Sequence, residues 1–450
     1  MRVHFIAIGG SAMHNLALAL HYKGYQVTGS DDAVFEPSKG RLLKADLLPN
    51  EMGWFPEKIE KGIDAVILGM HAREDNSELK KALDLGLKVY SYPEFLYQQS
   101  KNKKRIVIGG SHGKTTITSM ILHVLQYHKV DCDYMVGAQL EGFDTMVRLT
   151  EEAPMMLLEG DEYLSSPIDR RPKFHLYQPH IALLSGIAWD HINVFPTFEN
   201  YVEQFSIFAD MVSDALVYCQ ADDEILKLMQ SHGPSNKLPY QVPAHEIKNG
   251  ITFLNTAFGE IPLKIFGDHN LMNMEGARLV CEQVDINAEK FYEAIQTFKG
   301  ASKRLEEIAR TKDSVAYKDF AHSPSKVKAT THSVKQQFGD RKLVACLELH
   351  TFSSLNETFL KEYEGALDFA DVALVYFSPK ALAHKKMPDL DPEMVRKAFV
   401  NEKVEIFTDS EAVQNRLNSE DYAKATLLLM TSGNFDGVDL NAFATRLLSK

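Results

Sequence analysis

Short apolar runs alternate with amphipathic stretches along most of this 450-residue chain. The first run covers residues 2 to 8, and it is followed by a glycine turn, a helical pattern to about residue 23 and a second apolar run at residues 25 to 29. Further runs that predict strands lie at residues 64–69, 88–90, 181–185, 251–255, 262–266, 314–317, 343–347, 372–376, 404–407 and 426–430. Strand patterns separated by helical patterns are typical of βαβ units, so the sequence predicts an α/β fold.

The length of the chain and two linker-like stretches predict how this fold divides. A chain of 450 residues is too long for one hydrophobic core, and at about 100 to 200 residues per domain it suggests three. A basic run near residue 103 and a small-residue run near residue 301 have the composition of linkers. We therefore predict a Rossmann-like domain at residues 1–100, a central domain at residues 101–299 and a second Rossmann-like domain at residues 300–450.

The formal net charge of −12 argues against a nucleic-acid partner, since no basic run longer than residues 101–105 interrupts the acidic balance. The four cysteines are widely spaced, so neither a zinc site nor a disulfide framework is indicated. No apolar run reaches the ~18 residues of a membrane span. We expect a cytoplasmic protein that does not associate with membranes.

A stretch around Lys114 combines an apolar strand, a glycine turn and two threonines at the start of an apolar helix. Because Gly110 and Gly113 lack side chains, backbone N–H groups can converge on phosphate oxygens at the helix N-terminus. Lys114 would add a positive charge between the β- and γ-phosphates, and Thr115 carries a hydroxyl placed to bind Mg²⁺. The loop is a shortened P-loop, since Ile108 stands where the full pattern has glycine. The residues expected to bind ATP here are Gly110, Ser111, His112, Gly113, Lys114, Thr115 and Thr116.

A second apolar strand, beginning near residue 154, ends in a cluster of carboxylates. Open α/β sheets bind their ligands at such strand ends. Glu159 is placed to complete a Mg²⁺ site with Thr115, since Mg²⁺ prefers oxygen ligands and retains waters. The alternative is a solvated acidic loop. His191, beyond the strand at residues 181–185, is a candidate contact for a second metal or an acyl group, or else a structural hydrogen-bonding residue.

The opening glycine turn is a candidate nucleotide site. A tight turn at a helix N-terminus suits a diphosphate, and an acidic residue about 20 positions later suits a ribose or a base edge. The dinucleotide fingerprint is broken, because Ala7 and Ala12 stand where glycine is expected. The residues expected to hold the ligand are Gly9, Gly10, Ser11, Ser30 and Asp31.

Five polar residues later in the chain are candidates for the same chemistry. Asn270 and Asn273 lie three positions apart and share one face of a first helical turn, where their amides suit adenine or, alternatively, cap the helix. Arg304 is suited to clamp a γ-phosphate from a third domain. Asp319 and His322 follow a predicted strand.

These motifs occur together in the order found in the Mur ligases of peptidoglycan metabolism, which the sequence resembles over essentially its whole length. The matching segments are Gly9-Gly10, Gly29-Ser30-Asp31, residues 110–116, residues 159–162, Asp190-His191, residues 267–273, Lys303-Arg304 and residues 319–322. The resemblance implies an ATP- and Mg²⁺-dependent ligase that holds a UDP-sugar in its first domain. It also implies that a carboxylate is phosphorylated to an acyl phosphate, which an amine then attacks. The catalytic residues that it implies are Lys114, Glu159, His191, Arg304 and His322, with Thr115, Glu159 and His191 on the metal and Asp319 near the ribose.

Two branches of the family use UDP-N-acetylmuramate and differ in the amine that they add. One adds L-alanine, and the other adds the murein tripeptide L-Ala-γ-D-Glu-meso-diaminopimelate during cell-wall recycling. Residues 162–179 and 430–437 resemble the tripeptide branch, and residues 350–356 lack the arginines that suit a small amino acid in the alanine branch. We predict tripeptide ligation by a monomer or homodimer, with L-alanine ligation as the alternative.

Departures from the family pattern keep other classes open. Ser323 stands where relatives often have a second histidine, which leaves the role of His322 open, and residues 186–188 lack a polar Asn-x-Glu segment. A non-catalytic nucleotide-binding module is therefore a further alternative. A nicotinamide-dependent dehydrogenase would explain the opening turn but would give Lys114 and Thr115 no role.

Overall fold

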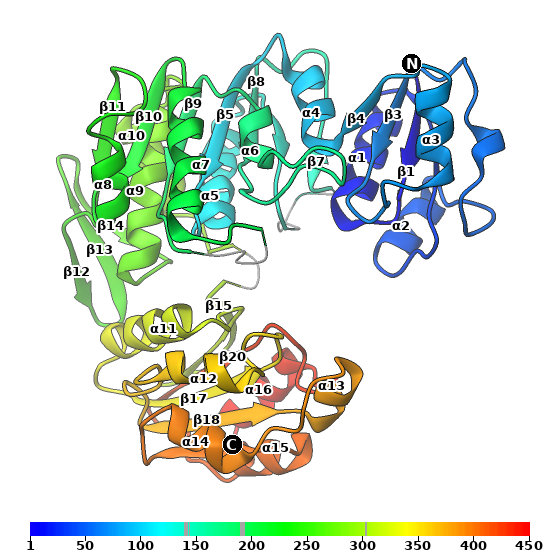
Figure 1. Cartoon of the computed structure of the whole chain (residues 1–450). Coiled ribbons are helices and arrows are strands. Elements are labelled where there is room, and N and C mark those ends of the chain that lie inside the picture. The colour runs from blue at the N-terminus through cyan, green and yellow to red at the C-terminus, as the bar shows by residue number, and fades with distance from the viewer. Residues whose placement is uncertain (139–142, 144, 190–193, 302–303) are drawn as a thin grey trace. The chain divides into compact units, whose positions relative to one another are not determined.

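The computed structural model describes residues 1–138, 143, 145–189, 194–301 and 304–450 (Figure 1). The chain divides into two compact units, one formed by residues 1–241 and 272–295 and the other by residues 242–271 and 296–450. The N-terminal and middle sheets lie in the first unit, and the C-terminal sheet lies in the second.

The N-terminal domain is built on a parallel sheet with the strand order β2-β1-β3-β4. Its strands are β1 (Arg2–Ile6), β2 (Gln26–Ser30), β3 (Ala65–Leu68) and β4 (Val89–Ser91). Its helices are α1 (Ser11–Tyr22), α2 (Ser38–Lys44), the 3-10 helix η1 (Pro56–Lys58), α3 (Ser77–Asp84) and α4 (Tyr92–Ser100). The central strands β1 and β3 are almost wholly buried, which explains their continuous apolar sequence.

The middle sheet has seven strands in the order β11-β10-β9-β5-β8-β6-β7, and only the β6–β7 pair is antiparallel within it. Its strands are β5 (Lys104–Gly109), β6 (Asp133–Met135), β7 (Val147–Arg148), β8 (Met155–Glu159), β9 (Ile181–Leu184), β10 (Ala215–Cys219) and β11 (Lys237–Tyr240). Its helices are α5 (Lys114–Tyr127), α6 (Lys173–Leu176), α7 (Phe198–Asp210), α8 (Asp223–Leu228), α9 (Asp268–Glu282) and α10 (Ala288–Ile295). Since β5 and β8 are parallel neighbours, their carboxyl ends lie side by side.

The second unit contains a small antiparallel sheet and a larger mixed one. The small sheet is formed by β12 (His245–Lys248), β13 (Ile251–Thr256) and β14 (Gly259–Leu263). The larger sheet has the order β15-β16-β20-β17-β18-β19, and only its β15–β16 pair is antiparallel. Its strands are β15 (Glu306–Arg310), β16 (Val315–Asp319), β17 (Lys342–Leu349), β18 (Val372–Phe377), β19 (Val404–Phe407) and β20 (Ala425–Met430). Its helices are α11 (Pro324–Gln337), α12 (Glu357–Leu360), η2 (Lys361–Tyr363), α13 (Pro379–His384), α14 (Pro392–Ala398), α15 (Ser410–Asn418) and α16 (Leu440–Leu448).

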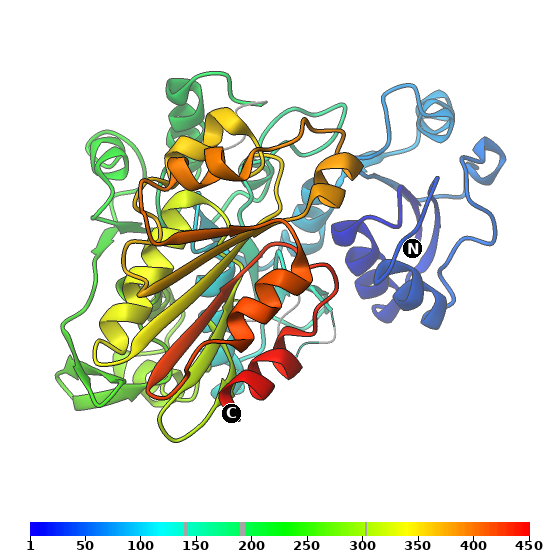
Figure 2. The ribbon, with the colours of Figure 1, turned by 90° about the horizontal axis from the view of Figure 1, so that it is seen from below.

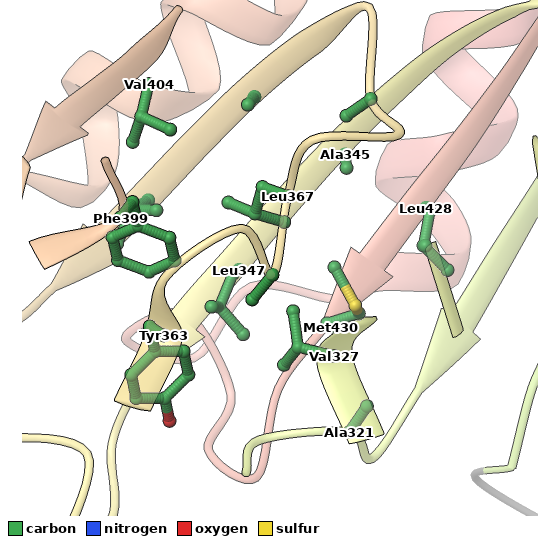
Figure 3. Close-up of a cluster of buried hydrophobic side chains, with 14 of the residues drawn as sticks. Ala321, Val327, Ala345, Leu347, Tyr363, Leu367, Phe399, Val404, Leu428 and Met430 are labelled. Carbon is green, nitrogen blue, oxygen red and sulfur yellow. The ribbon is translucent and has the colours of Figure 1, made fainter. Parts of the chain in front are cut away.

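Helices cover both faces of the larger sheet (Figure 2), and the side chains of its strands alternate between two cores, one on each face. In β17, Ala345 and Leu347 face the core under α11, α12 and α14, whereas Val344 and Cys346 face the core under α15 and α16. Figure 3 shows the first of these cores, where Tyr363 and its neighbours pack over the sheet. This period of two is the strand pattern on which a doubly covered sheet depends.

The predicted α/β fold is confirmed, and two strand boundaries were wrong for local reasons. The first strand ends at Ile6, because Ala7 adopts a left-handed conformation with φ of 70°. The run near residue 264 predicted a strand that would include Phe266. Instead, β14 ends at Leu263, and the Phe266 ring lies 5.3 Å from that of Tyr317. Within the described ranges, no helix is both long and apolar enough to cross a membrane.

Candidate active site

The loop between β5 and α5 depends on glycine at two positions. Gly110 and Gly113 have φ values of 124° and 77°, which residues with a side chain rarely adopt. A Cβ atom at Gly110 would lie 2.2 Å from Ser185 Oγ. The loop therefore keeps its backbone exposed toward the start of α5, where a helix N-terminus favours an anion.

Lys114 is held by the loop and by a carboxylate that the sequence analysis did not assign to the site. Its Nζ donates to Gly110 O at 2.6 Å and to Glu162 Oε2 at 2.7 Å. Burial by itself lowers the pKa of Lys114, but the carboxylates of Glu162, Asp161 and Glu159 together outweigh this effect, and the net pKa is raised. Lys114 is therefore a permanent cation at the loop. In the sequence, Glu162 could have been identified as a site residue because it lies in the same acidic cluster as Glu159.

Thr115 and Glu159 lie together, as predicted. Thr115 Oγ1 donates to Glu159 Oε1 at 2.8 Å, and the backbone N–H of Gly137 donates to Glu159 Oε2 at 2.7 Å. The pairing of Ile108 with Glu159 across β5 and β8 places the carboxylate beside the loop. Burial raises the pKa of Glu159.

This hydroxyl and carboxylate fit Mg²⁺, which prefers oxygen ligands and takes the rest of its shell from water and phosphate. Among the described residues, no group of three or more His, Cys, Asp or Glu side chains could hold a metal ion. His191, the third predicted ligand, lies outside the described residues.

A tyrosine links Glu162 to the phosphate loop. Tyr201 on α7 donates to Glu162 Oε1 at 3.2 Å, and its hydroxyl lies 2.8 Å from Ser111 Oγ. Ser111 Oγ also accepts the N–H of Ala188 at 2.9 Å. The Ser111 side chain therefore braces the loop, which leaves its backbone to face a phosphate.

The remaining loop residues pack against the ends of neighbouring strands. The His112 carbonyl accepts a hydrogen bond from Ser185, and the ring of His112 covers Gly186. Thr116 is buried in the first turn of α5. Both residues thus fix the loop against the sheet.

The two asparagines of α9 have different environments. Asn273 Oδ1 lies 2.5 Å from where a Cβ atom of Gly113 would be, so the amide lies directly over the phosphate loop. Asn270 Nδ2 donates to the carbonyl of Phe266 at 3.0 Å and closes the start of its own helix. The contact with the loop supports a ligand role for Asn273, whereas the amide of Asn270 is used in a side-chain to backbone hydrogen bond beside its own helix.

The N-terminal turn is shaped by its acidic residue. Asp31 Oδ2 accepts the N–H of Gly9 at 2.6 Å, and the carbonyl of Ser30 accepts the N–H of Ala7 at 2.9 Å. Burial raises the pKa of Asp31. Gly10 is the N-cap of α1, which begins at Ser11. The turn therefore presents a helix N-terminus, and Asp31 holds its backbone in place.

The three candidates of the second unit also lie near one another in sequence and in space. Both oxygens of Asp319 accept backbone N–H groups, from Leu305 at 2.5 Å and from Ala321 at 2.6 Å. Burial raises the pKa of Asp319. The Arg304 guanidinium lies 5.2 Å from the centre of the Phe320 ring, and His322 Nδ1 lies 2.7 Å from the carbonyl of Phe320. Asp319 thus organises the turn that carries the two basic side chains.

The chain is similar to known proteins over most of its length. Residues 2–104 match the catalytic domain of the Mur ligase family, and residues 108–281 match the Mur ligase middle domain. The UDP-N-acetylmuramate–L-alanine ligase of Lactobacillus acidophilus is 30% identical over 390 residues, which is 84% of each chain. The enzyme of the same name from Carboxydothermus hydrogenoformans is 27% identical over 97% of this chain and 95% of its own.

Solved structures share the fold at lower identity. A murein peptide ligase from Psychrobacter arcticus has a TM-score of 0.63 at 21% identity, covering 100% of this chain and 99% of its own. The UDP-N-acetylmuramate–alanine ligase from Thermotoga maritima has a TM-score of 0.71 at 17% identity, covering 100% and 98%. Together with the site geometry, these similarities show that the chain belongs to the Mur ligase family of ATP-dependent, amide-bond-forming peptidoglycan ligases.

Proposed function

We propose that this protein joins UDP-N-acetylmuramate to the murein tripeptide L-Ala-γ-D-Glu-meso-diaminopimelate in peptidoglycan recycling. The observation that carries the choice of amine lies in the loop after β17, at residues 350–356. This loop contains no arginine, and its first residue is His350, whose Nδ1 lies 3.7 Å from Glu348 Oε1. A histidine beside a buried carboxylate is a poor match for the arginine-rich segment that suits a free amino acid's carboxylate.

The phosphorylation step follows from the charges at the loop. The lactyl carboxylate oxygen of the sugar nucleotide attacks the γ-phosphorus of ATP, the bond to the β-γ bridging oxygen breaks, and ADP leaves. Lys114 stabilises the negative charge on the transferring group, and we assign Arg304 as a second cation for the γ-phosphate. Mg²⁺, held by Thr115, Glu159 and His191, supplies further charge neutralisation when bound.

The amide then forms on the acyl phosphate. The α-amine of the incoming peptide attacks the carbonyl carbon, the C–O bond to phosphate breaks, and the amine loses a proton. His322 is a candidate to contact this group, since its imidazole is held at Nδ1 by the carbonyl of Phe320. The site must exclude water at this step, because water would otherwise hydrolyse the acyl phosphate.

The substrates are assigned to the three parts of the chain as follows. The N-terminal turn at Gly9, Gly10 and Ser11 holds the diphosphate of the UDP-sugar, and Ser30 and Asp31 support that turn. Adenine lies near Asn273, with Asn270 at the start of the same helix, and the ribose lies near Asp319. We place the enzyme in the cytoplasm, where ATP is available, as a monomer or homodimer.

L-alanine is the second candidate amine, because the sequence relatives given above are named as L-alanine ligases. Phosphate release from ATP with Mg²⁺ and UDP-N-acetylmuramate, measured with L-alanine or with the tripeptide, separates the two. Turnover with the tripeptide alone, with a product of matching mass, supports the proposal. Turnover with L-alanine would refute the choice of amine, and no turnover with either would favour a non-catalytic relative.

A further inference from the structure

A cavity of about 690 Å³ lies in the first unit, away from the phosphate loop. Its walls come from β4 and α4, from the segment before and including α6, and from the end of α7. Its polar lining residues include two arginines and one carboxylate, and they are Tyr90, Glu94, Tyr97, Gln98, Arg170, Arg171, His175, Gln178 and Gln204. We refer to it as the α4–α7 cavity.

The cavity lies at the opposite end of the middle sheet from the catalytic groups. Tyr97 and Gln98 precede the start of β5, whereas the phosphate loop follows its end. Six strand residues span ~20 Å, so the cavity is separate from the site at Lys114. Ligands bound at the phosphate loop therefore do not fill it.

The wall formed by α4 is fixed to the middle sheet by a buried arginine. Arg105 donates from Nη1 to Ser100 O at 2.8 Å and from Nε to Tyr177 O at 2.8 Å. On the other side of the cavity, Arg171 Nη2 lies 3.4 Å from Glu94 Oε1. The two walls are thus connected, and the cavity is preformed rather than a gap between independent surfaces.

The lining holds two arginines and the carboxylate of Glu94, and one of the arginines, Arg170, has donors without a partner among the described residues. Arg170 makes no hydrogen bond or ion pair with any residue in the described part of the chain, and it is exposed. Arg171 is shared between Asp169, at 2.6 Å, and Glu94, whose other oxygen caps α4. Burial lowers the pKa of His175, so this side chain adds no positive charge to the cavity at neutral pH. Guanidinium groups with free donors favour carboxylates and phosphates.

One wall of the cavity is continuous with the catalytic acidic segment. The carbonyl of Arg171 accepts the N–H of Ser165 at 3.0 Å, and the N–H of Lys173 donates to Tyr163 O at 2.9 Å. Lys173 Nζ also pairs with Asp161 at 2.5 Å. Residues 161–166 and 169–174 therefore form a paired turn that joins Arg171 to the partner of Lys114, Glu162.

We propose that the α4–α7 cavity is a second ligand site, which binds a small organic anion bearing carboxylate or phosphate groups and transmits its occupancy to the catalytic segment. The anion is bound by Arg170 and Arg171, with the amide of Gln98 and the phenol of Tyr97 as further donors. Binding at Arg171 competes with Asp169 and shifts the paired turn that carries Glu162. This inference does not depend on which amine the enzyme uses.

The test is isothermal titration of the full-length protein with succinate and, separately, with glycerol 3-phosphate. At least one probe is expected to bind, and Arg170→Gln is expected to weaken that binding about tenfold, since one charge-assisted contact is lost. Arg446→Gln, which removes an exposed guanidinium on α16, serves as the matched control and should bind like the wild type. Because Arg170 has no partner among the described residues, its substitution should leave the melting temperature unchanged.

The outcomes are decisive in each direction. Binding of succinate alone assigns the site to carboxylates, and binding of glycerol 3-phosphate alone assigns it to phosphates. Failure of both probes to bind, or equal binding by Arg170→Gln and the wild type, overturns the proposal. Coupling is tested by ATP-dependent phosphate release, where saturating probe should change the rate at least twofold in the wild type and leave it unchanged in Arg170→Gln. An equal change in both proteins would refute the coupling.

Discussion

The ion pair between Lys114 and Glu162 offers a direct test of how the catalytic loop is stabilised. The Glu162 side chain is 2% exposed and that of Lys114 is 16% exposed, so Glu162→Gln would leave a nearly buried ammonium group without its counter-charge. Removing one partner from a fully buried pair costs roughly 3–5 kcal/mol. Here Lys114 retains its hydrogen bond to Gly110, and glutamine can still accept from Tyr201. We therefore expect a loss of about 2–3 kcal/mol in the free energy of unfolding.

Urea denaturation of the wild type and of Glu162→Gln, analysed for the transition of the first unit, measures this difference. Glu152→Gln is the matched control, because Glu152 is exposed and makes no hydrogen bond or ion pair with any described residue. The control should unfold within about 0.5 kcal/mol of the wild type. Equal stability of Glu162→Gln and Glu152→Gln would refute the reasoning, since the pair would then contribute no more than an exposed charge.

Three further changes test other parts of the structure. Thr115→Val should reduce Mg²⁺-dependent phosphate release by about a hundredfold or more, whereas Thr115→Ser should retain most of it, and equal activity of the two variants would exclude the hydroxyl as a metal ligand. Gly110→Ala should lower the melting temperature and abolish ATP binding, because its Cβ would overlap Ser185; Gly437→Ala, at a φ of 91° with open space, should show only the smaller cost of backbone strain. Glu78→Gln should destabilise the N-terminal domain by roughly 1–3 kcal/mol at pH 7, because Glu78 accepts from Phe55 and pairs with His4. Burial opposes ionisation of Glu78, but these contacts outweigh burial and lower the pKa of Glu78. The stabilisation is therefore present above the ordinary pKa of about 4.5 and is lost as the pH falls through the lowered pKa. Acid unfolding that does not differ between the wild type and Glu78→Gln would contradict this reasoning.

The parts of the candidate site whose positions in the fold can be read from the sequence are those fixed by local geometry. Lys114 and Thr115 follow a glycine loop, and parallel pairing of the adjacent strand fixes Glu159 beside them. The end of β5 and the start of α5 lie only a few residues apart, so the sequence alone fixes the position of Lys114 and Thr115 relative to the strand. The packing of Asn273 over Gly113 depends on where α9 docks, whereas the sequence indicated only that Asn270 and Asn273 share one face of a helical turn.

Other features depend on contacts between distant segments, which apolar patterns do not specify. The acidic cluster contains three carboxylates, and nothing in their spacing identifies Glu162 as the partner of Lys114. The α4–α7 cavity is formed by residues near positions 97, 170 and 207, which come from three separate elements. Its arginines were noted in the sequence only as part of a segment that resembles one branch of the family.

The two acidic residues at the ends of β2 and β16 show why residue type alone cannot separate a ligand contact from a structural one. Asp31 directly follows β2 and Asp319 is the last residue of β16, and both are buried and accept backbone N–H groups of a nearby turn. The short side chain of an aspartate at a strand end reaches backbone N–H groups that would otherwise be buried without a hydrogen-bond partner. Hydrogen bonds to these buried N–H groups stabilise the fold more than a solvated contact with a ligand would. Glu159 differs because its longer side chain reaches a hydroxyl on the neighbouring loop. Whether a carboxylate at a strand end has a structural role or a ligand role therefore depends on its nearest hydrogen-bond donor. A donor in the carboxylate's own turn gives a structural role, and a donor in another element leaves the carboxylate facing the site.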